Sequence, residues 1–344
     1  MRNYVLSCLA LCSVLRLCAQ QEPGYTKYMF NTLAYNPGYA GSHDHLAASA
    51  LYRSQWMNWG AAQGAPVTQT VSIHSPWRKR IGLGLSLVND AIGARGTTSA
   101  QLVYAYRIPF GDATLSLGLQ GGVLSYRANW DKLSYRDPQS NDAAFNQGNI
   151  NEILPTFGAG VYFYAPKFYL GLSVPTLLEW KLRQRLSTEE GLRIGQLYRH
   201  LYVAAGAALP LQGEDLVFKP SILVKTAGLL SAGNQTNGQP VQSPITFDVD
   251  LSLLFFQKLW VGGAFRSSFN AFNNAEFTGI DPLDPHDSAD LWAAFYLSQQ
   301  LRIGASYDFT LSKMQSVGGN SFEVVIGYDL HKKVSKVQSP RYFF

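Results

Sequence analysis

The most telling property of this 344-residue chain is how little charge it carries. Only 15% of its residues are charged, whereas about 25% is usual in a soluble domain. After residue 20 it has no uncharged apolar run of roughly 18 residues, which excludes an ordinary helical membrane protein. Its hydrophobic content of 47% excludes a disordered chain. These absences leave a soluble all-β protein or a β-barrel in a membrane.

Residues 1–19 have the features of a signal peptide. Arg2 supplies a positive charge, residues 5–15 are apolar, and Ala19 is a small residue suited to cleavage. A lipobox ending at Cys18 is the alternative, although the residues before it suit that interpretation poorly. We therefore exclude this segment from the fold.

The mature chain lacks cysteine, because Cys8, Cys12 and Cys18 all lie in the leader. An internal disulfide framework, a thiolate metal site and a cysteine nucleophile are thereby excluded. Loss of Arg2 and Arg16 leaves 26 of the 28 basic residues against 23 acidic ones. So small an excess of positive charge is not a nucleic-acid-binding footprint, and we expect no nucleic-acid partner.

From residue 45 onward, apolar residues recur at every second position. Ile81 and the leucines that follow it alternate with small or polar residues over 81–87, and Asp248 and Asp250 alternate with apolar residues over 245–253. We predict fourteen strands of about ten residues or more, long enough to cross a bilayer when tilted. They span 45–56, 66–75, 80–89, 97–108, 113–127, 153–164, 167–176, 197–209, 215–226, 244–255, 258–268, 288–298, 300–311 and 321–331.

The connections between these strands alternate between long and short. The long ones are 57–65, 90–96, 128–152, 177–196, 227–243, 269–287 and 312–320, with short turns between them. A sandwich has shorter strands and no reason for such alternation, although a soluble barrel remains an alternative. The pattern predicts a transmembrane antiparallel β-barrel of about 14 strands over residues 45–331, with short periplasmic turns and long extracellular loops.

Aromatic residues near the predicted strand ends fit the girdles that barrels place at membrane interfaces. Any β-rich protein has many aromatics, so this observation has weight only beside the strand pattern. The residues are Tyr52, Trp56, Trp77, Tyr106, Phe110, Tyr126, Trp130, Tyr164, Phe256, Trp260 and Phe309.

Charged residues within the strands predict the lumen face. A charged residue facing lipid costs roughly 1–4 kcal/mol depending on depth, so Asp248 and Asp250 must face inward. These charges either pair across neighbouring strands, which is the simpler interpretation, or line a substrate path. With about fourteen strands the interior is wide enough to be wet or plugged. The same side carries Lys219, Lys225, Arg266, Arg302, Asp308 and Glu323.

The sequence has no catalytic motif. We find no G-x-S-x-G elbow, Walker loop, H-E-x-x-H helix or G-x-G-x-x-G turn. We therefore expect that the protein is not an enzyme and that it binds no cofactor. His43 and His45 flank Asp44 at the start of the first strand, where a solvated loop is a simpler interpretation than a metal site. Glu189 and Glu190 lie in a charged stretch that predicts a solvated hairpin extension or short helix, with a partner surface as the alternative.

The segment 20–44 has no alternation long enough for a strand. We predict that it is a periplasmic segment tucked under or into the lumen. In NPGYAG (36–41), Pro37 lacks an amide donor, and Gly38 and Gly41 permit unusual backbone angles. The motif therefore predicts a sharp bend that presents Tyr39.

The first and last strands of a barrel must meet. Arg53 lies on the lumen face of the first strand, so we expect it to pair with Glu323 or Asp329 of the last. The tail 332–344 is basic. It either docks an acidic partner or keeps the end of the chain soluble.

Several motifs are similar to those of the PorP/SprF proteins of the type IX secretion system in the Bacteroidetes. The chain has YMFN at 28–31 and NPGYAG at 36–41, with Gly38 where alanine is usual. Phe344 is an extra residue after the terminal RYF. Over nearly the whole mature chain the further motifs follow in the family's order, namely RSQW (53–56), GAPVT (64–68), GLGLSLVND (82–90), YAYRIP (104–109), LSLGLQGG (115–122) and SPRYF (339–343).

The resemblance implies a cell outer-membrane barrel that supports protein export, surface attachment of adhesins or gliding motility by binding partners. The implied partners are outer-membrane lipids, periplasmic ring and lipoprotein components, and a secreted surface protein or adhesin as cargo. A channel for small-molecule uptake is the alternative, and it rests on the strand count alone. The motif residues expected to bind partners or hold structure are Tyr28, Phe30, Asn31, Asn36, Pro37, Tyr39, Arg53, Trp56, Arg341 and Tyr342.

Overall fold

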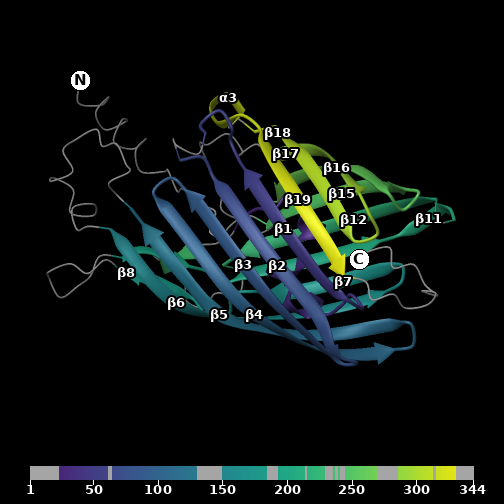
Figure 1. Cartoon of the computed structure of the whole chain (residues 1–344). Helices are drawn as coiled ribbons and strands as arrows, with labels where there is room; N and C mark the ends of the chain where they lie inside the picture. Colours follow the sequence, from purple (N-terminus) through teal and green to yellow (C-terminus); the bar gives the residue numbers. More distant parts are fainter. Residues whose placement is uncertain are drawn as a thin grey trace, which may run out of the picture.

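The strands of this chain close into one antiparallel barrel (Figure 1). The computed structural model describes residues 23–60, 64–129, 149–183, 193–213, 215–228, 235–236, 239–240, 245–269, 286–312 and 315–330. No helix within these residues is long and apolar enough to cross a membrane.

The barrel wall has fourteen strand positions, as the sequence predicted. β10 and β11 share one position, because both pair with β12 on either side of a break at Ala208. The wall strands are β1 (Leu46–Ser54), β2 (Val67–Arg78), β3 (Ile81–Ile92), β4 (Arg95–Phe110), β5 (Ala113–Ala128), β6 (Ile150–Ala165), β7 (Phe168–Val174), β10 (His200–Ala207), β11 (Leu209–Gln212), β12 (Leu216–Ala227), β15 (Ile245–Phe255), β16 (Leu259–Phe269), β17 (His286–Tyr296), β18 (Leu301–Thr310) and β19 (Ser321–Leu330).

Two pairings close the barrel. β1 pairs with β19 in a register that sets Arg53 opposite Glu323, and Figure 1 shows the yellow β19 beside β1. β10 pairs with both β7 and β12. Every wall strand except the short β11, which pairs with β12 alone, therefore has a neighbour on each side, and pairing of β10 with β12 closes the sheet.

The alternation of side chains places apolar residues on the outside. In β4, Leu102 is 70% exposed while its neighbour Val103 is 3% exposed. In β15, Leu251 is exposed while Asp250 is fully buried. A wall that is apolar outside and polar inside is the arrangement of a barrel in lipid, and it accounts for the shortage of charge.

The two ends of the barrel differ. At the end that we call the short-turn end, the strands are joined by residues 79–80, 111–112, 166–167, 213–215, 256–258 and 297–300. The opposite end, the long-loop end, includes the hairpin of β8 (Trp180–Arg183) and β9 (Arg193–Leu197), which is the predicted hairpin extension. β13 (Gln235–Thr236), β14 (Gln239–Pro240) and α3 (Gln315–Gly318) lie in other connections there. Glu189 and Glu190 fall outside the described residues.

One predicted loop is wrong. Residues 90–96 are not a long connection, because β3 and β4 continue to a turn at Gly93 and Ala94. Gly93 adopts a φ of +57°, which favours glycine and permits the tight turn. The local polarity of the stretch concealed the continuation of the ladder.

The aromatic girdle is confirmed only in part. Tyr52, Trp77, Tyr106, Phe110, Phe256 and Phe309 are exposed on the outside. Tyr126, Tyr164 and Trp260 are buried and face inward, so their assignment to the girdle was wrong. Nearness to a strand end does not decide the face, whereas parity along the strand does. Trp130 lies outside the described residues.

The residues before β1 form three short turns of helix. They are η1 (Tyr28–Phe30), α2 (Thr32–Tyr35) and η2 (Pro37–Tyr39). Each is too short to be stable alone. Their position therefore depends on contacts with the barrel wall.

Candidate functional site

Residues 23–43, which we call the plug segment, run through the lumen from one end of the barrel to the other. Pro23 lines a cavity of about 80 Å³ with Trp180, near the long-loop end. His43 contacts Asp329, near the short-turn end. Except for Met29 and Ala34, every residue from 26 to 43 is buried. The described part of the predicted segment 20–44 therefore lies mainly inside the barrel.

Lys27 anchors the plug segment to the wall. Its Nζ lies 3.0 Å from Asp250 Oδ2 and 2.5 Å from Asp290 Oδ1. The backbone N–H groups of Thr26 and Lys27 each donate to a carboxylate oxygen of Glu323 at 2.8 Å. The plug segment thus forms ion pairs or hydrogen bonds with buried carboxylates on β15, β17 and β19.

Arg53 of β1 links the plug segment to carboxylates on β18 and β19. Its Nη2 lies 2.9 Å from Asp308 Oδ2, and its Nη1 lies 3.8 Å from Glu323 Oε2. Thr26 accepts a hydrogen bond from Arg53 and donates one to Asp308. Glu323 was one of the two partners predicted for Arg53. The other, Asp329, instead contacts His43 and His45.

Phe30 lies in an aromatic box. Its ring meets Trp260 edge-on at 5.1 Å and Trp292 at 5.5 Å between centroids. The guanidinium of Arg302 lies 4.4 Å from the Phe30 centroid, within range of a cation–π contact. Lys219 lies over the other indole, with Nζ 3.4 Å from the Trp260 centroid. Two of the charged residues predicted for the lumen, Lys219 and Arg302, therefore contact the aromatic rings of this box.

Two further plug residues bond to opposite sides of the wall. The hydroxyl of Tyr28 lies 2.7 Å from Ser221 Oγ on β12. On β2, Ser72 donates to Asn31 Oδ1 at 3.1 Å. The plug segment is thus held from both sides of the lumen.

The NPGYAG motif forms a bend against the wall. Asn36 Oδ1 accepts from the Gly38 N–H at 2.9 Å, and Asn36 Nδ2 donates to the Val161 carbonyl at 3.1 Å. Pro37 occupies the first turn of η2, where its missing N–H is harmless. Gly41 has the predicted unusual angle, with a φ of +71°. Gly38 has no positive φ and is instead required for space, since a Cβ there would lie 2.9 Å from Tyr162 N.

Glycines of the wall make room for this bend. A Cβ at Gly118 would overlap the backbone of Pro37 and Gly38, and a Cβ at Gly82 would overlap the Ala40 carbonyl. These two glycines belong to the motifs GLGLSLVND and LSLGLQGG. The motifs at 36–41, 82–90 and 115–122, far apart in the sequence, therefore form one close-packed contact.

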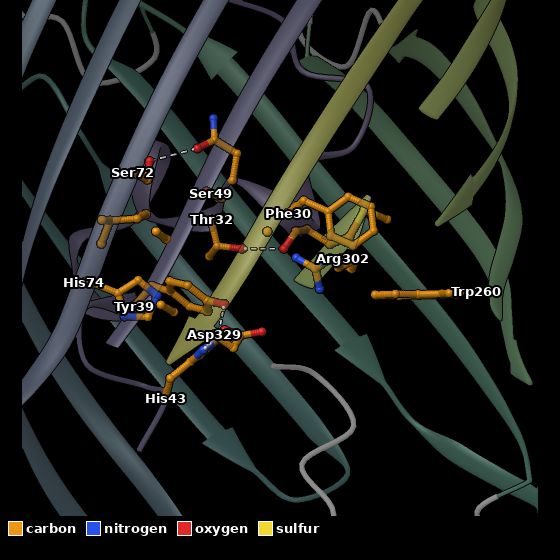
Figure 2. Close-up of a pocket in the computed structure, with 16 residues that line it drawn as sticks. Phe30, Thr32, Tyr39, His43, Ser49, Ser72, His74, Trp260, Arg302 and Asp329 are labelled. Carbon is orange, nitrogen blue, oxygen red and sulfur yellow. Dashed lines mark hydrogen bonds and ion pairs between the residues drawn. The ribbon is translucent and has the colours of Figure 1, made fainter. Parts of the chain in front are cut away.

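Tyr39, which the predicted bend presents, is buried in the lumen. Its ring meets Tyr162 edge-on at 5.4 Å, and its hydroxyl lies 3.1 Å from His43 Nε2. Figure 2 shows Tyr39 beside His74, His43 and Asp329. A solvated loop is wrong for His43, which is 6% exposed, whereas Asp44 is exposed. Burial lowers the pKa of His43.

The remaining predicted residues lie in three places. Arg266 pairs with Asp248 across β15 and β16, and Lys225 is partly buried on the lumen side of β12, opposite Thr246. Trp56 packs against α3, where a Cβ on Gly318 would lie 2.9 Å from Trp56 Cγ. Arg341 and Tyr342, with the leader 1–19 and the tail 332–344, fall outside the described residues.

Sequence reasoning missed Lys27 and Asp290. Asp290 alternates with Ser288 and Trp292 in a strand, and the rule that placed Asp250 inside the barrel applies to it equally. Lys27 gave no such indication, because it precedes the first strand and shares no periodicity with its partners.

Comparison with known proteins identifies the family of the chain. Residues 17–328 match the sequence model of the family described as "Type IX secretion system membrane protein PorP/SprF". None of the curated proteins compared with this chain matches it.

Several solved barrels are similar in fold. Omp33 of Acinetobacter baumannii is 8% identical and covers 83% of this chain and 98% of its own, with a TM-score of 0.43. A FadL homologue of Pseudomonas aeruginosa is 14% identical and covers 90% and 95%, with a TM-score of 0.47. The toluene transporter TbuX of Ralstonia pickettii is 10% identical and covers 89% and 93%, with a TM-score of 0.48. These scores are too low to carry a functional argument.

Proposed function

Because the chain belongs to the PorP/SprF family of type IX secretion system membrane proteins, we propose that it supports protein export, surface attachment of adhesins or gliding motility by binding partner proteins. It is an outer-membrane β-barrel of a secretion-protein family, not of an enzyme family. The observation that carries the proposal is the plug segment, which crosses the lumen and is bonded to the wall along its length. A lumen filled in this way favours a role as a rigid scaffold, which holds the long-loop end and the short-turn end of the barrel in fixed positions.

The two ends offer different surfaces to partners. The long loops face the cell exterior by the usual orientation of outer-membrane barrels, and we assign cargo contact to them. The short turns and the basic tail 332–344 then face the periplasm, where ring and lipoprotein components of the system would dock. The apolar outer row of the wall contacts the outer-membrane lipids.

The plug segment also weighs against the alternative of an uptake channel. An open pore of fourteen strands needs a wet lumen, whereas here Lys27, Phe30 and Asn31 bond to or pack against wall strands on several sides. Steady conductance of the purified barrel in planar bilayers, together with intact secretion in a deletion strain, would favour the channel instead.

Deletion of the gene tests the proposal. Surface proteins of the parent, the deletion strain and the strain complemented with the intact gene are labelled on whole cells and quantified by mass spectrometry. We expect at least one secreted surface protein to be lost on deletion and restored on complementation. Normal display of every such protein in the deletion strain would overturn the proposal. Co-purification of the barrel from native membranes then identifies its bound partners.

A further inference from the structure

Three potential metal ligands converge at the short-turn end of the barrel. His43 and His45 come from the chain just before β1, and Asp329 lies near the end of β19. The pairing of β1 with β19 sets Ala47 opposite Asp329, which brings the last strand to the two histidines. Their potential ligand atoms all lie within 4.8 Å of one another.

The spacing of these atoms resembles that of a coordination sphere. His43 Nδ1 and His45 Nε2 each lie 3.3 Å from the same oxygen, Asp329 Oδ1. Without an ion, the His45 contact is a long hydrogen bond, since such bonds are usually about 2.7–3.2 Å. A tetrahedral ion with bonds of about 2.0–2.1 Å holds its ligands about 3.3–3.4 Å apart. The two distances therefore match two edges of such a tetrahedron, and the two histidine nitrogens lie within 4.8 Å of each other.

We propose that His43, His45 and Asp329 bind one divalent transition-metal ion, with Zn²⁺ as the best-matched ion. Two imidazoles and one carboxylate form a borderline ligand set that suits zinc better than magnesium or calcium. A fourth position is left for water. His45 and Asp329 are partly exposed, so the ion can enter from the short-turn end and a small turn of the His45 ring completes the site.

The surroundings of His43 orient it for this role. The hydroxyl of Tyr39 lies 3.1 Å from His43 Nε2, which leaves Nδ1 to face Asp329. A hydrogen bond to the second ring nitrogen is what metal-bound histidines usually have. His74 lies close by, but its Nδ1 accepts from the Gly41 N–H at 3.2 Å and so holds the bend of the plug segment.

Arg302 lowers the affinity that we expect of this site for a metal ion. It lines the same cavity of about 40 Å³ as His43 and Asp329, and its positive charge opposes that of the ion (Figure 2). We therefore expect binding that EDTA reverses. A bound ion would fasten the end of the plug segment to the last strand, at the seam where the barrel closes.

Zinc titration of the purified barrel tests the site. The full chain is expressed with its leader, extracted from outer membranes in detergent without a histidine tag, treated with EDTA and titrated with ZnCl₂ by calorimetry. We expect one Zn²⁺ per barrel and a rise in the thermal unfolding midpoint. His45→Gln and Asp329→Asn should each weaken binding at least about tenfold and abolish the rise.

His200→Gln is the matched control, because His200 is a buried histidine at the long-loop end whose Nδ1 lies 3.0 Å from the Tyr198 carbonyl. It should bind zinc as the unaltered barrel does. His45→Gln changes a partly exposed side chain, so the barrel should still fold. Failure of the unaltered barrel to bind zinc would overturn the proposal, as would equal binding by the two ligand variants. Neither result would affect the proposed role in secretion.

Discussion

Lys27 Nζ lies 3.0 Å from Asp250 Oδ2, although the two residues are 223 positions apart in the chain. Both side chains are buried, and Asp250 also accepts a hydrogen bond from the Trp292 indole at 2.8 Å. Taking two charges out of water is unfavourable unless each is well paired. The plug segment and the wall therefore depend on one another for stability.

Replacement of Lys27 by methionine should strongly destabilise the barrel. The change leaves Asp250 and Asp290 without their cation, and removal of one partner of a buried pair costs about 3–5 kcal/mol. The free energy of unfolding in urea, measured after refolding into lipid vesicles, checks this. Lys258→Met, at an exposed turn residue, is the control and should change the value little. Equal stability of the two variants would contradict the structural role of Lys27, and adding Asp290→Asn to Lys27→Met should recover part of the loss.

Gly118→Val should displace the bend of the plug segment without preventing the strand from forming. A Cβ at Gly118 would overlap backbone atoms of Pro37 and Gly38, whereas one at the neighbouring Gly121 would lie an ordinary 3.4 Å from the Phe157 side chain. We expect Gly118→Val to lower the free energy of unfolding by at least about 1–3 kcal/mol and to expose residues 28–41 to protease. Gly121→Val should do neither, and protection of the plug in both variants would show that the close packing is unimportant.

Truncation of Phe30 should open a cavity between Trp260 and Trp292. A Phe→Ala change in a packed interior costs about 3–5 kcal/mol, and Phe30→Leu should cost less because it keeps more of the volume. Thermal unfolding midpoints of the two variants give the order. If Phe30→Ala matched the unaltered barrel, the box would not hold the plug.

Removal of the Tyr28 hydroxyl should weaken the attachment of the plug segment to β12. The hydroxyl lies 2.7 Å from Ser221 Oγ, so Tyr28→Phe removes this hydrogen bond and should lower the free energy of unfolding by about 1 kcal/mol. Ser221→Ala, added to Tyr28→Phe, should cause little further loss because the bond is already absent. Unchanged stability of Tyr28→Phe, measured by unfolding in urea, would contradict the role of this bond.

The wall of the barrel could be predicted from the sequence because lipid imposes a strict rule on alternate residues. Asp248 and Asp250 had to face inward, and they are buried. The same rule could have moved Tyr126 and Trp260 from the girdle to the lumen. The turn at Gly93 and Ala94 was missed because a strand that continues beyond the apolar pattern leaves no periodic trace.

The contents of the lumen could not be predicted in this way. Lys27 and His43 precede the first strand, and their partners lie in strands more than 200 residues away. These contacts depend on which strands face one another across a closed barrel. In the sequence, only the glycines of the wall strands indicated contacts between the plug segment and the wall. Gly82 and Gly118 stand on the lumen face, where larger side chains would otherwise fill the space.

In the proposed function, the barrel serves secretion as a scaffold only while its plug segment is in place. The most direct test measures the cognate surface protein on deletion cells that carry Gly118→Val or Gly121→Val, after equal insertion in the outer membrane has been verified. We predict that display is lost with Gly118→Val and normal with Gly121→Val. Normal display with Gly118→Val, in a barrel whose plug is shown by proteolysis to be displaced, would contradict the account.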